Sequence, residues 1–200
     1  DDNFLVTLTA DSTAAAADLK TIDAATSGII TATGVATITG SASDVTDVLA
    51  VETSQGNAGQ QIDLDTNFTV TISDTGNVSA LTLTNIDDNT PGTVTVTEAV
   101  TLTGTAAQIR LAAQRDNAGT LVLASNFGAK LDVEEVVNAE DLITIVGQTS
   151  ATIDATAATA ITGTAEAVAA AINHSQVNHD DDFNVTLSEA AATGVQLTDI

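Results

Sequence analysis

The side chains of this 200-residue chain that could do chemistry are mainly carboxylates, and several of them gather just before a phenylalanine. Two clusters are Asp63, Asp65 and Asn67, which precede Phe68, and Asp180, Asp181 and Asp182, which precede Phe183. Ca²⁺ takes six to eight oxygen ligands of this kind. Crowded carboxylates also need a cation or protonation to offset their repulsion. The clusters therefore predict calcium sites, with acidic, solvated turns as the alternative.

Neither cluster matches a known calcium loop. The segment from Asp63 begins like an EF-hand, but Phe68 stands where the sharp turn needs glycine, and no glutamate closes the loop. The glycine-rich nonapeptide of calcium-loaded β-rolls is also missing from the sequence. Any calcium site would therefore be of a different design.

No combination of residues indicates catalysis. His174 and His179 lie near the second aspartate cluster, but they occur in one part of the chain only, which favours a polar loop. Glu134 and Glu135 are the only adjacent glutamates, and they fall in a segment that reads as a turn. No Gly-x-Ser-x-Gly elbow is present. We therefore predict no catalytic residue and no enzymatic activity.

The composition, and above all the net charge, limits the classes of partner that this chain is expected to bind. Asp and Glu number 27 against four Lys and Arg, giving a formal charge of −23. Nucleic acids and anionic membrane surfaces require a cationic face, so both are excluded as expected partners. The sequence has no cysteine, and no apolar run approaches the roughly 18 residues that cross a membrane. At 44% hydrophobic residues, the chain can still form a core.

The chain repeats itself along its length with a period of about 60 residues, as repeat architectures do. Related segments begin at the four phenylalanines: Phe4, Phe68, Phe127 and Phe183. At a constant offset after each of the first three stands the glycine of an Ile/Leu-Thr-Gly triplet: Gly40, Gly104 and Gly163. A Leu/Ile pair recurs at a constant offset too, and Leu197 and Ile200 repeat it with one deletion. We number the copies 1 (4–67), 2 (68–126), 3 (127–182) and 4 (183–200).

Hydrophobic periodicity predicts the elements of each copy. Strands are predicted over 4–8, 68–72, 127–131 and 183–187, then over 28–32, 93–97 and 151–155, with shorter pieces at 37–39, 62–64, 121–123, 177–179 and their counterparts. Helices are predicted over 16–24, 80–88 and 139–147, and again after the N-cap residues Ser41, Thr105 and Thr164. Ser79 and Asn138 are further N-cap candidates.

Alternating strands and helices favour parallel strands in an α/β fold. Repetition of that unit favours a solenoid of parallel strands and short helices, in which each copy needs its neighbours to bury enough surface. Equivalent strands of adjoining copies should then join a common sheet. The alternative is a string of small independent α/β domains.

Four stretches of the repeat stand out as motifs: VTISD at 70–74, AAADLKTID at 15–23, VATITGSASDV at 35–45 and ITGTAEAV at 161–168. They resemble the tandem repeats of giant secreted bacterial surface proteins, which include adhesins and filament- or layer-forming proteins. The resemblance implies an extracellular structural role, often with calcium, and transfers no catalytic residue. The start at Asp1 and the end in mid-pattern lead us to expect a piece of a longer protein.

The expected function is therefore a non-catalytic, acidic and cation-stabilised repeat segment of an extracellular bacterial surface, adhesive or filament-forming protein. Its expected partners are other repeats, met end to end or as neighbours. The alternative is a module that binds a ligand such as a glycan through the segments of variable length at 41–67, 105–126 and 164–182. An enzyme of the parallel β-helix type, such as a polysaccharide lyase, is disfavoured because aromatic and basic residues are scarce.

Overall fold

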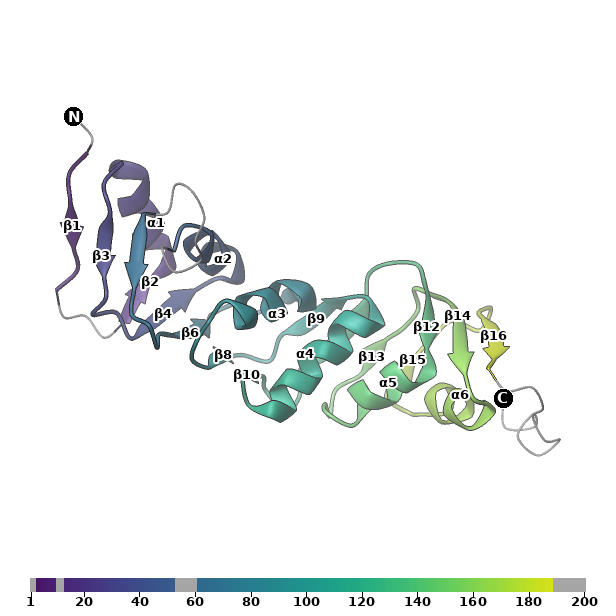
Figure 1. The fold of residues 1–200 in the computed structure, drawn as a ribbon. Helices are drawn as coiled ribbons and strands as arrows, with labels where there is room; N and C mark the ends of the chain where they lie inside the picture. Colours follow the sequence, from purple (N-terminus) through teal and green to yellow (C-terminus); the bar gives the residue numbers. More distant parts are fainter. Residues whose placement is uncertain (1–2, 10–12, 53–60, 189–200) are drawn as a thin grey trace. The chain divides into compact units, whose positions relative to one another are not determined.

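The computed structural model is an α/β structure (Figure 1), and it confirms the parallel strands and short helices of the predicted fold. It describes residues 3–9, 13–52 and 61–188. Leu197 and Ile200, the marks of a helix in copy 4, lie outside the described residues. Every strand pair in the described part of the chain is parallel.

The described helices are α1 (Ala16–Ala25), α2 (Ala42–Ala50), α3 (Ala80–Asp88), α4 (Ala106–Ala118), α5 (Ala139–Val146) and α6 (Ala165–Ile172). The helix N-caps predicted at Ser41, Thr105, Thr164 and Asn138 are confirmed by side-chain hydrogen bonds. The side-chain oxygens of Ser41, Thr105 and Thr164 each accept from the backbone N–H three residues on, and that of Asn138 accepts from the N–H of Glu140. Ser79 directly precedes α3.

The strands form four sheets. Sheet A contains β1 (Val6–Thr7), β3 (Ile30–Ala32) and β5 (Ile62–Leu64). Sheet B contains, in order, β2 (Thr13–Ala15), β4 (Thr37–Gly40), β6 (Thr69–Ile72), β8 (Val94–Val96) and β10 (Leu121–Val122). Sheet C contains β7 (Asn77–Ser79), β9 (Thr101–Gly104), β11 (Gly128–Leu131), β13 (Ile153–Asp154) and β15 (Val177–Asn178). Sheet D contains β12 (Glu135–Asn138), β14 (Ala158–Gly163) and β16 (Asn184–Leu187).

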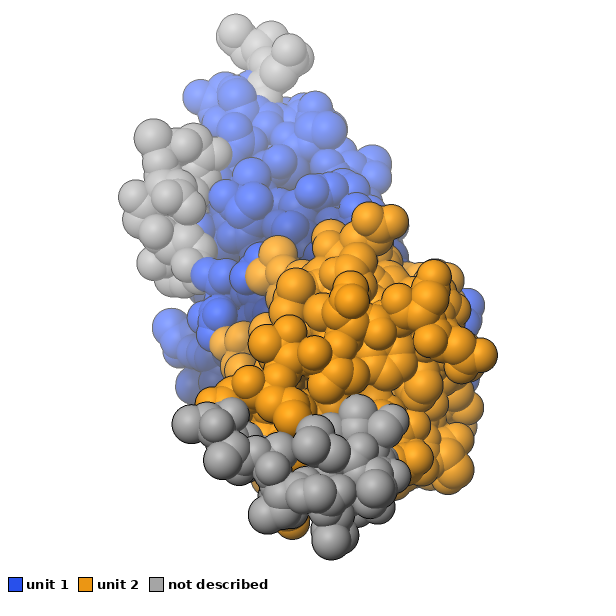
Figure 2. Space-filling model, turned by 90° about the vertical axis from the view of Figure 1, so that its right-hand side faces the viewer, with its two compact units in different colours: residues 1–75, 82–98, 118–123 blue, residues 76–81, 99–117, 124–200 orange. Residues whose placement is uncertain are grey.

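The chain forms two compact units, coloured separately in Figure 2. Unit 1 comprises residues 1–75, 82–98 and 118–123, and it holds sheets A and B with α1 and α2. Unit 2 comprises residues 76–81, 99–117 and 124–200, and it holds sheets C and D with α5, α6 and nearly all of α4. The division between the units falls within α3.

In each unit, alternation of apolar residues and threonine along the strands separates a buried face from an exposed one. In sheet B, for example, Ile38, Val70 and Val94 pair side by side and are fully buried, while the threonines beside them face outward. The corresponding buried row in sheet C includes Leu102 and Ile153. These rows and the apolar stripes of the helices make up the core, since aromatic residues are few.

The prediction that equivalent strands of adjoining copies share a sheet is wrong. The strands that directly follow the four phenylalanines are β1, β6, β11 and β16, and they lie in sheets A, B, C and D, respectively. Each strand pairs instead with a strand of the next strand–helix segment along the chain, as Val6 with Ile30 and Ile38 with Val70. Each copy therefore holds two strand–helix segments. Three strands in a row precede α3 and α5, whereas two precede α4 and α6. As a result, each strand of one copy lies in the sheet that follows the sheet of its equivalent in the copy before.

Adjoining copies nevertheless share sheets. Strand β4 of copy 1 pairs with β6 of copy 2, and β9 of copy 2 pairs with β11 of copy 3.

The short strands β2, β7 and β12, directly before α1, α3 and α5, were not expected from the sequence. In particular, Glu135 begins β12 and does not lie in a turn.

Candidate functional site

The first aspartate cluster lies in unit 1, around the end of β5. Asp63 is within that strand, and Asp65 and Asn67 follow it. The backbone N–H of Asn67 donates to Asp65 Oδ1 at 2.7 Å, so one carboxylate oxygen already holds the turn. Asp65 also lines an open pocket of about 280 Å³.

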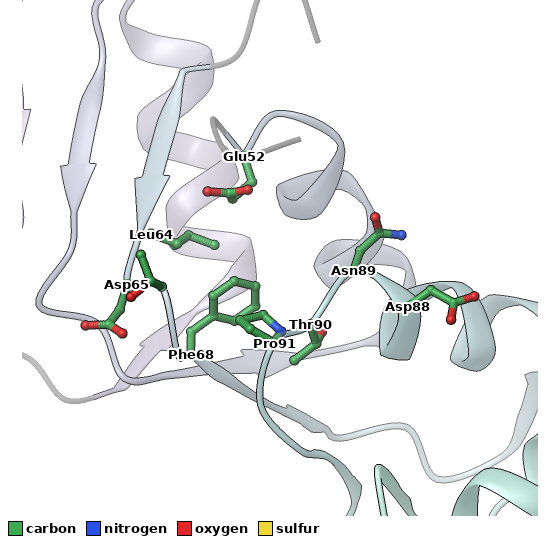
Figure 3. Close-up of a pocket in the computed structure, with 9 residues that line it drawn as sticks. Glu52, Leu64, Asp65, Phe68, Asp88, Asn89, Thr90 and Pro91 are labelled. Atoms are coloured by element: carbon green, nitrogen blue, oxygen red, sulfur yellow. The ribbon is translucent and has the colours of Figure 1, made fainter. Parts of the chain in front are cut away.

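That pocket is walled by apolar and acidic side chains (Figure 3). Phe68 and Leu64 are buried in its wall, and Glu52, only 2% exposed, lies on another side. The carboxylates of Glu52, Asp65 and Asp88 point in different directions in Figure 3 and do not converge on one point. The pocket therefore does not gather its oxygen atoms around a single centre.

The second cluster lies in unit 2, where Asp180, Asp181 and Asp182 are all exposed. Asp180 and Asp182 line an open groove of about 620 Å³, together with Asp132 and Glu134 near the end of β11. Four carboxylates, contributed by two segments far apart in the sequence, thus surround one groove. Among the described residues that line it, the only cation is the ammonium group of Lys130, which lies 3.7 Å from Asp154.

Across residues 3–9, 13–52 and 61–188, no three His, Asp or Glu side chains lie close enough together to hold a metal ion. The calcium sites at the two aspartate clusters therefore stay a prediction. The carboxylates of each cluster do not point toward a common centre that could hold an ion. They would have to rearrange, or be completed by other groups, to surround an ion.

The two histidines are engaged with the backbone. Nδ1 of His174 accepts from the N–H of Gln176 at 3.3 Å. The ring nitrogens of His179 lie 3.0 Å from the carbonyl oxygen of Ile172 and 2.9 Å from that of Asp180. The ring of His179 also contacts Phe183 edge to face, with 4.9 Å between the ring centres. These contacts fit the polar loop that the sequence favours.

Two carboxylates have a role that the sequence analysis missed: each caps a helix of the preceding copy. Asp74 Oδ2 accepts from the N–H of Ala42, at the start of α2, at 2.7 Å. Glu135 Oε1 accepts from the N–H of Ala106, at the start of α4, also at 2.7 Å. A negative charge at a helix N-terminus is stabilising. In the sequence these acids stand 32 and 29 residues after their helices begin, and local cap patterns do not reach so far.

The scarce basic residues also connect neighbouring segments. Lys20 on α1 lies 2.6 Å from Asp44 and 2.7 Å from Asp47, both on α2. These contacts raise the pKa of Lys20, and the hydrogen bonds from Lys20 and Ser41 lower the pKa of Asp44. Burial raises the pKa of Asp23, near the end of α1.

In unit 2, Nε of Arg110 on α4 lies 2.7 Å from Asp141 on α5. The angle is poor for a hydrogen bond, so this contact is ionic, while the guanidinium donates to Gln114 at 2.9 Å. Lys130 and Asp154, on β11 and β13, form a further pair. Lys20, Arg110 and Lys130 thus each form an ion pair between successive strand–helix segments.

A buried threonine follows the phenylalanine by 22 residues in each of copies 1 to 3: Thr26, Thr90 and Thr149. The hydroxyl of Thr26 donates to the carbonyl of Phe4, and that of Thr149 donates to the carbonyl of Phe127. In copy 2 the N–H of Gly92 bonds the carbonyl of Phe68, and Thr90 bonds within its own helix end. The recurrence of threonine at this spacing was visible in the sequence and could have been found there.

No helix within the described ranges has the length and apolar character needed to traverse a bilayer. Comparison with known proteins gives no relative: no protein-family model matches the chain, and neither a curated protein nor a solved structure is detectably similar to it.

The described polar residues thus divide into two groups. One group, which includes Asp74, Glu135 and Lys20, joins successive segments of the fold. The other is a surplus of solvent-facing carboxylates, of which Asp132, Glu134, Asp180 and Asp182 line one groove. The first group can hold strands and helices in register, and the second can attract cations.

Proposed function

We propose that this chain is a non-catalytic structural repeat segment of an extracellular bacterial surface, adhesive or filament-forming protein, built as a solenoid whose copies each depend on the next. Its work would be mechanical: it would space and orient other parts of a surface protein. Its partners would be neighbouring repeats or further chains, met end to end.

The observation that carries this proposal is the junction between copies, which has the same construction twice. At the first, β4 pairs with β6 in register, Ile38 beside Val70, and Asp74 caps α2. At the second, β9 pairs with β11, Leu102 beside Ala129, and Glu135 caps α4. A repeated backbone junction with a repeated cap is what a modular scaffold requires.

Charge supports the same proposal. A surplus of carboxylates keeps an extended repeat array soluble and prevents non-specific association. In solutions containing calcium, the acidic groove lined by Asp132, Glu134, Asp180 and Asp182 would attract divalent cations and so reduce the repulsion across it. We propose calcium as the stabilising ion on this basis.

Mutual dependence of the copies can be tested by amide hydrogen exchange. Ile38 is fully buried in β4 of copy 1, so I38D should remove protection from β4 and also from β6 and β8 of copy 2, because one sheet contains all three strands. The control is I161D in β14 of unit 2, which should leave β4, β6 and β8 protected. Loss of protection confined to copy 1 in I38D would contradict the scaffold.

The surface location needs its own test. Antibodies against the purified chain should label intact, unpermeabilised cells of the source organism, and labelling only after permeabilisation would contradict it. The alternative function, glycan binding, would be favoured by specific binding on a glycan array that is lost when the 41–67 segment is shortened.

A further inference from the structure

The pocket of unit 1 drawn in Figure 3 joins one deeply buried carboxylate to several apolar side chains. Glu52 is only 2% exposed, and Leu64 and Phe68 are buried beside the same space. Pro91, the one proline of the chain, lines it too. Figure 3 shows Glu52 across the pocket from Phe68 and Pro91. A ligand bound here would therefore meet a carboxylate on one side and apolar groups on the other.

Backbone hydrogen bonds hold both sides of this pocket. On the carboxylate side, the N–H of Ile62 in β5 donates to the carbonyl of Val51 at 3.1 Å, and Glu52 forms a parallel bridge with Ile62. On the apolar side, the N–H of Gly92 donates to the carbonyl of Phe68 at 3.1 Å, which joins the loop after α3 to the start of β6. The pocket is thus preformed, and preformed sites lose less entropy when they bind.

The apolar side is particular to copy 2. Serine stands at the position of Pro91 in copies 1 and 3, as Ser27 and Ser150. The hydroxyl of Thr90 donates to the carbonyl of Ile86 at 2.7 Å, whereas its counterparts in those copies donate to the carbonyl of the phenylalanine. The loop after α3 is therefore built differently from its counterparts, and the difference adds an apolar ring to the pocket.

The charge of the lining selects cations. Asp65 and Asp88 add two carboxylates to that of Glu52, and the described residues that line the pocket include no Lys, Arg or His. A cleft lined by charge of one sign concentrates ligands of the opposite sign.

The arrangement of the lining suits an organic cation better than a metal ion. A divalent metal needs several oxygen atoms around one point, and these carboxylates point in different directions (Figure 3). An ammonium group forms a strong hydrogen bond with a single carboxylate, and the ring of Phe68 can attract it further. An aliphatic chain attached to the ammonium would gain by leaving water for the apolar side.

We propose that this pocket binds a primary alkylammonium group, with the ammonium at Glu52 and the methylene chain along Leu64, Phe68 and Pro91. The volume of about 280 Å³ suits a short, unbranched chain. Two sources carry this group: the lysine side chain of another protein and a free aliphatic amine. The site goes beyond the proposed scaffold function and does not depend on it.

The test is an NMR titration of the full chain with n-butylamine, which is protonated at neutral pH, at constant ionic strength. The amide signals of Glu52, Phe68 and Gly92 should shift together, saturate and fit one dissociation constant. n-Butanol has a similar chain without the charge, and methylamine has the charge with almost no chain. Each should bind at least about tenfold more weakly than n-butylamine.

Two variants separate the contributions of the charge and the ring. E52Q keeps the shape of the side chain and removes its charge, so it should weaken n-butylamine binding at least about tenfold. F68L keeps an apolar side chain and removes the ring, so it should weaken binding about twofold to fivefold.

Glu98 supplies the matched control for E52Q, because it is an exposed glutamate of the same unit. E98Q removes the same charge and should leave the dissociation constant unchanged. D180N/D182N, in the groove of unit 2, should leave it unchanged as well.

General attraction to an acidic chain would give a different result. Shifts that spread over many acidic residues, do not saturate and vanish with added NaCl would overturn the proposal. Equal affinities of E52Q and E98Q for n-butylamine would overturn it too, as would equal affinities of the wild type for n-butylamine and n-butanol. The last comparison needs no variant, so it decides the question even if E52Q fails to fold.

Further ligands identify the source of the alkylammonium group. A lysine side chain is the source if a peptide with one lysine between glycines binds at least as tightly as n-butylamine, and its acetyllysine form does not bind. A free amine is the source if that peptide fails to bind while cadaverine displaces n-butylamine. Failure of n-butylamine to bind would leave the I38D experiment, and with it the scaffold, unaffected.

Discussion

Asp74 Oδ2 lies 2.7 Å from the backbone N of Ala42, although the two residues are 32 positions apart and belong to adjoining copies. Glu135 and Ala106 repeat this relationship at the next junction, at the same distance. A side chain of one copy thus caps the N-terminus of a helix in the copy before it. The junction therefore depends on a charged hydrogen bond as well as on strand pairing.

Removing this cap should weaken the junction. We expect D74A to lower the free energy of unfolding by about 0.5–2 kcal/mol, the usual value of an N-terminal helix cap. D74N, which keeps an acceptor oxygen but loses the charge, should lose less. Urea denaturation measures the stability, and the amide proton of Ala42 reports the bond directly by NMR. An unchanged Ala42 amide in D74A would contradict the assignment.

The buried threonine of each copy gives a second prediction. The Thr149 hydroxyl donates to the carbonyl of buried Phe127 and accepts from the N–H of Ala151 at 3.1 Å. T149V keeps the shape but leaves both groups without this partner, so we expect a loss of about 1–3 kcal/mol. T149S should retain most of the stability.

Thr144 supplies the matched control for Thr149. It is a threonine near the surface whose hydroxyl bonds the carbonyl of Glu140 within its own helix. T144V should change the stability by less than about 0.5 kcal/mol. Equal losses in T149V and T144V, measured by urea denaturation, would show that the buried bond contributes nothing special.

The glycines that end the Ile/Leu-Thr-Gly triplets are required for two different reasons. Gly104 has a φ of +139°, and a Cβ there would lie 2.6 Å from Gln108 Oε1, which caps Thr105. We expect G104A to cost about 1–3 kcal/mol through backbone strain, which corresponds to several degrees in Tm for a chain of this length. Gly40 shows no such φ, but a Cβ there would lie 3.0 Å from that of Ala16.

Gly76 provides the comparison for G104A. A Cβ at Gly76 would meet nothing within 4 Å, and its φ is not positive. G76A should therefore leave Tm unchanged or raise it slightly by restricting the unfolded chain. A drop in Tm as large in G76A as in G104A would refute the strain argument.

The sequence predicted local features well and long-range ones poorly. Alternating threonine and valine marked β6, and the Ser41 and Thr105 caps lie within three residues of their partners, so local patterns revealed them. Strand partners are fixed by the path of the chain between strands, and one additional three-residue strand, β7, begins a new sheet, which β9 and β11 then join. Such a short strand has no periodicity to detect.

The candidate site shows the same limit. The residue types at 63–67 and 180–182 indicated oxygen ligands, but residue type does not determine whether side chains converge. Asp132 and Glu134 join Asp180 and Asp182 at one groove only because β11 pairs with β13 and β13 with β15. That pairing could not be derived from the composition of either segment alone.

The ion pairs of Lys20 predict a pH dependence whose sign follows from the shifts. The pKa of Asp44 is lowered from its ordinary 3.8, so its contribution is present above that value and is lost as the pH falls below it. The pKa of Lys20 is raised from 10.5, so its contribution is present below that value and is lost as the pH rises above it. K20M should therefore lower Tm at neutral pH, and the difference from the wild type should vanish at both extremes.

Lys130 is the control for K20M, because its ammonium lies 3.7 Å from Asp154 and forms a weaker pair. K130M should lower Tm less than K20M does. Added NaCl should reduce both differences, since exposed pairs are screened. A K20M effect that is constant from pH 3 to pH 11 would contradict the electrostatic explanation.

Calcium should raise the thermal stability of the chain through the carboxylates of the groove in unit 2. At about 5 mM Ca²⁺, a site with a Kd of about 1 mM would add about 1 kcal/mol, or a few degrees in Tm. The shift should reverse with chelator and exceed that of NaCl at equal ionic strength. D180N/D182N should abolish it if the groove binds the ion, whereas D63N/D65N should abolish it if the cluster near Phe68 does. A melting midpoint that Ca²⁺ leaves unchanged, or moves no more than NaCl does, would leave both clusters as acidic, solvated turns.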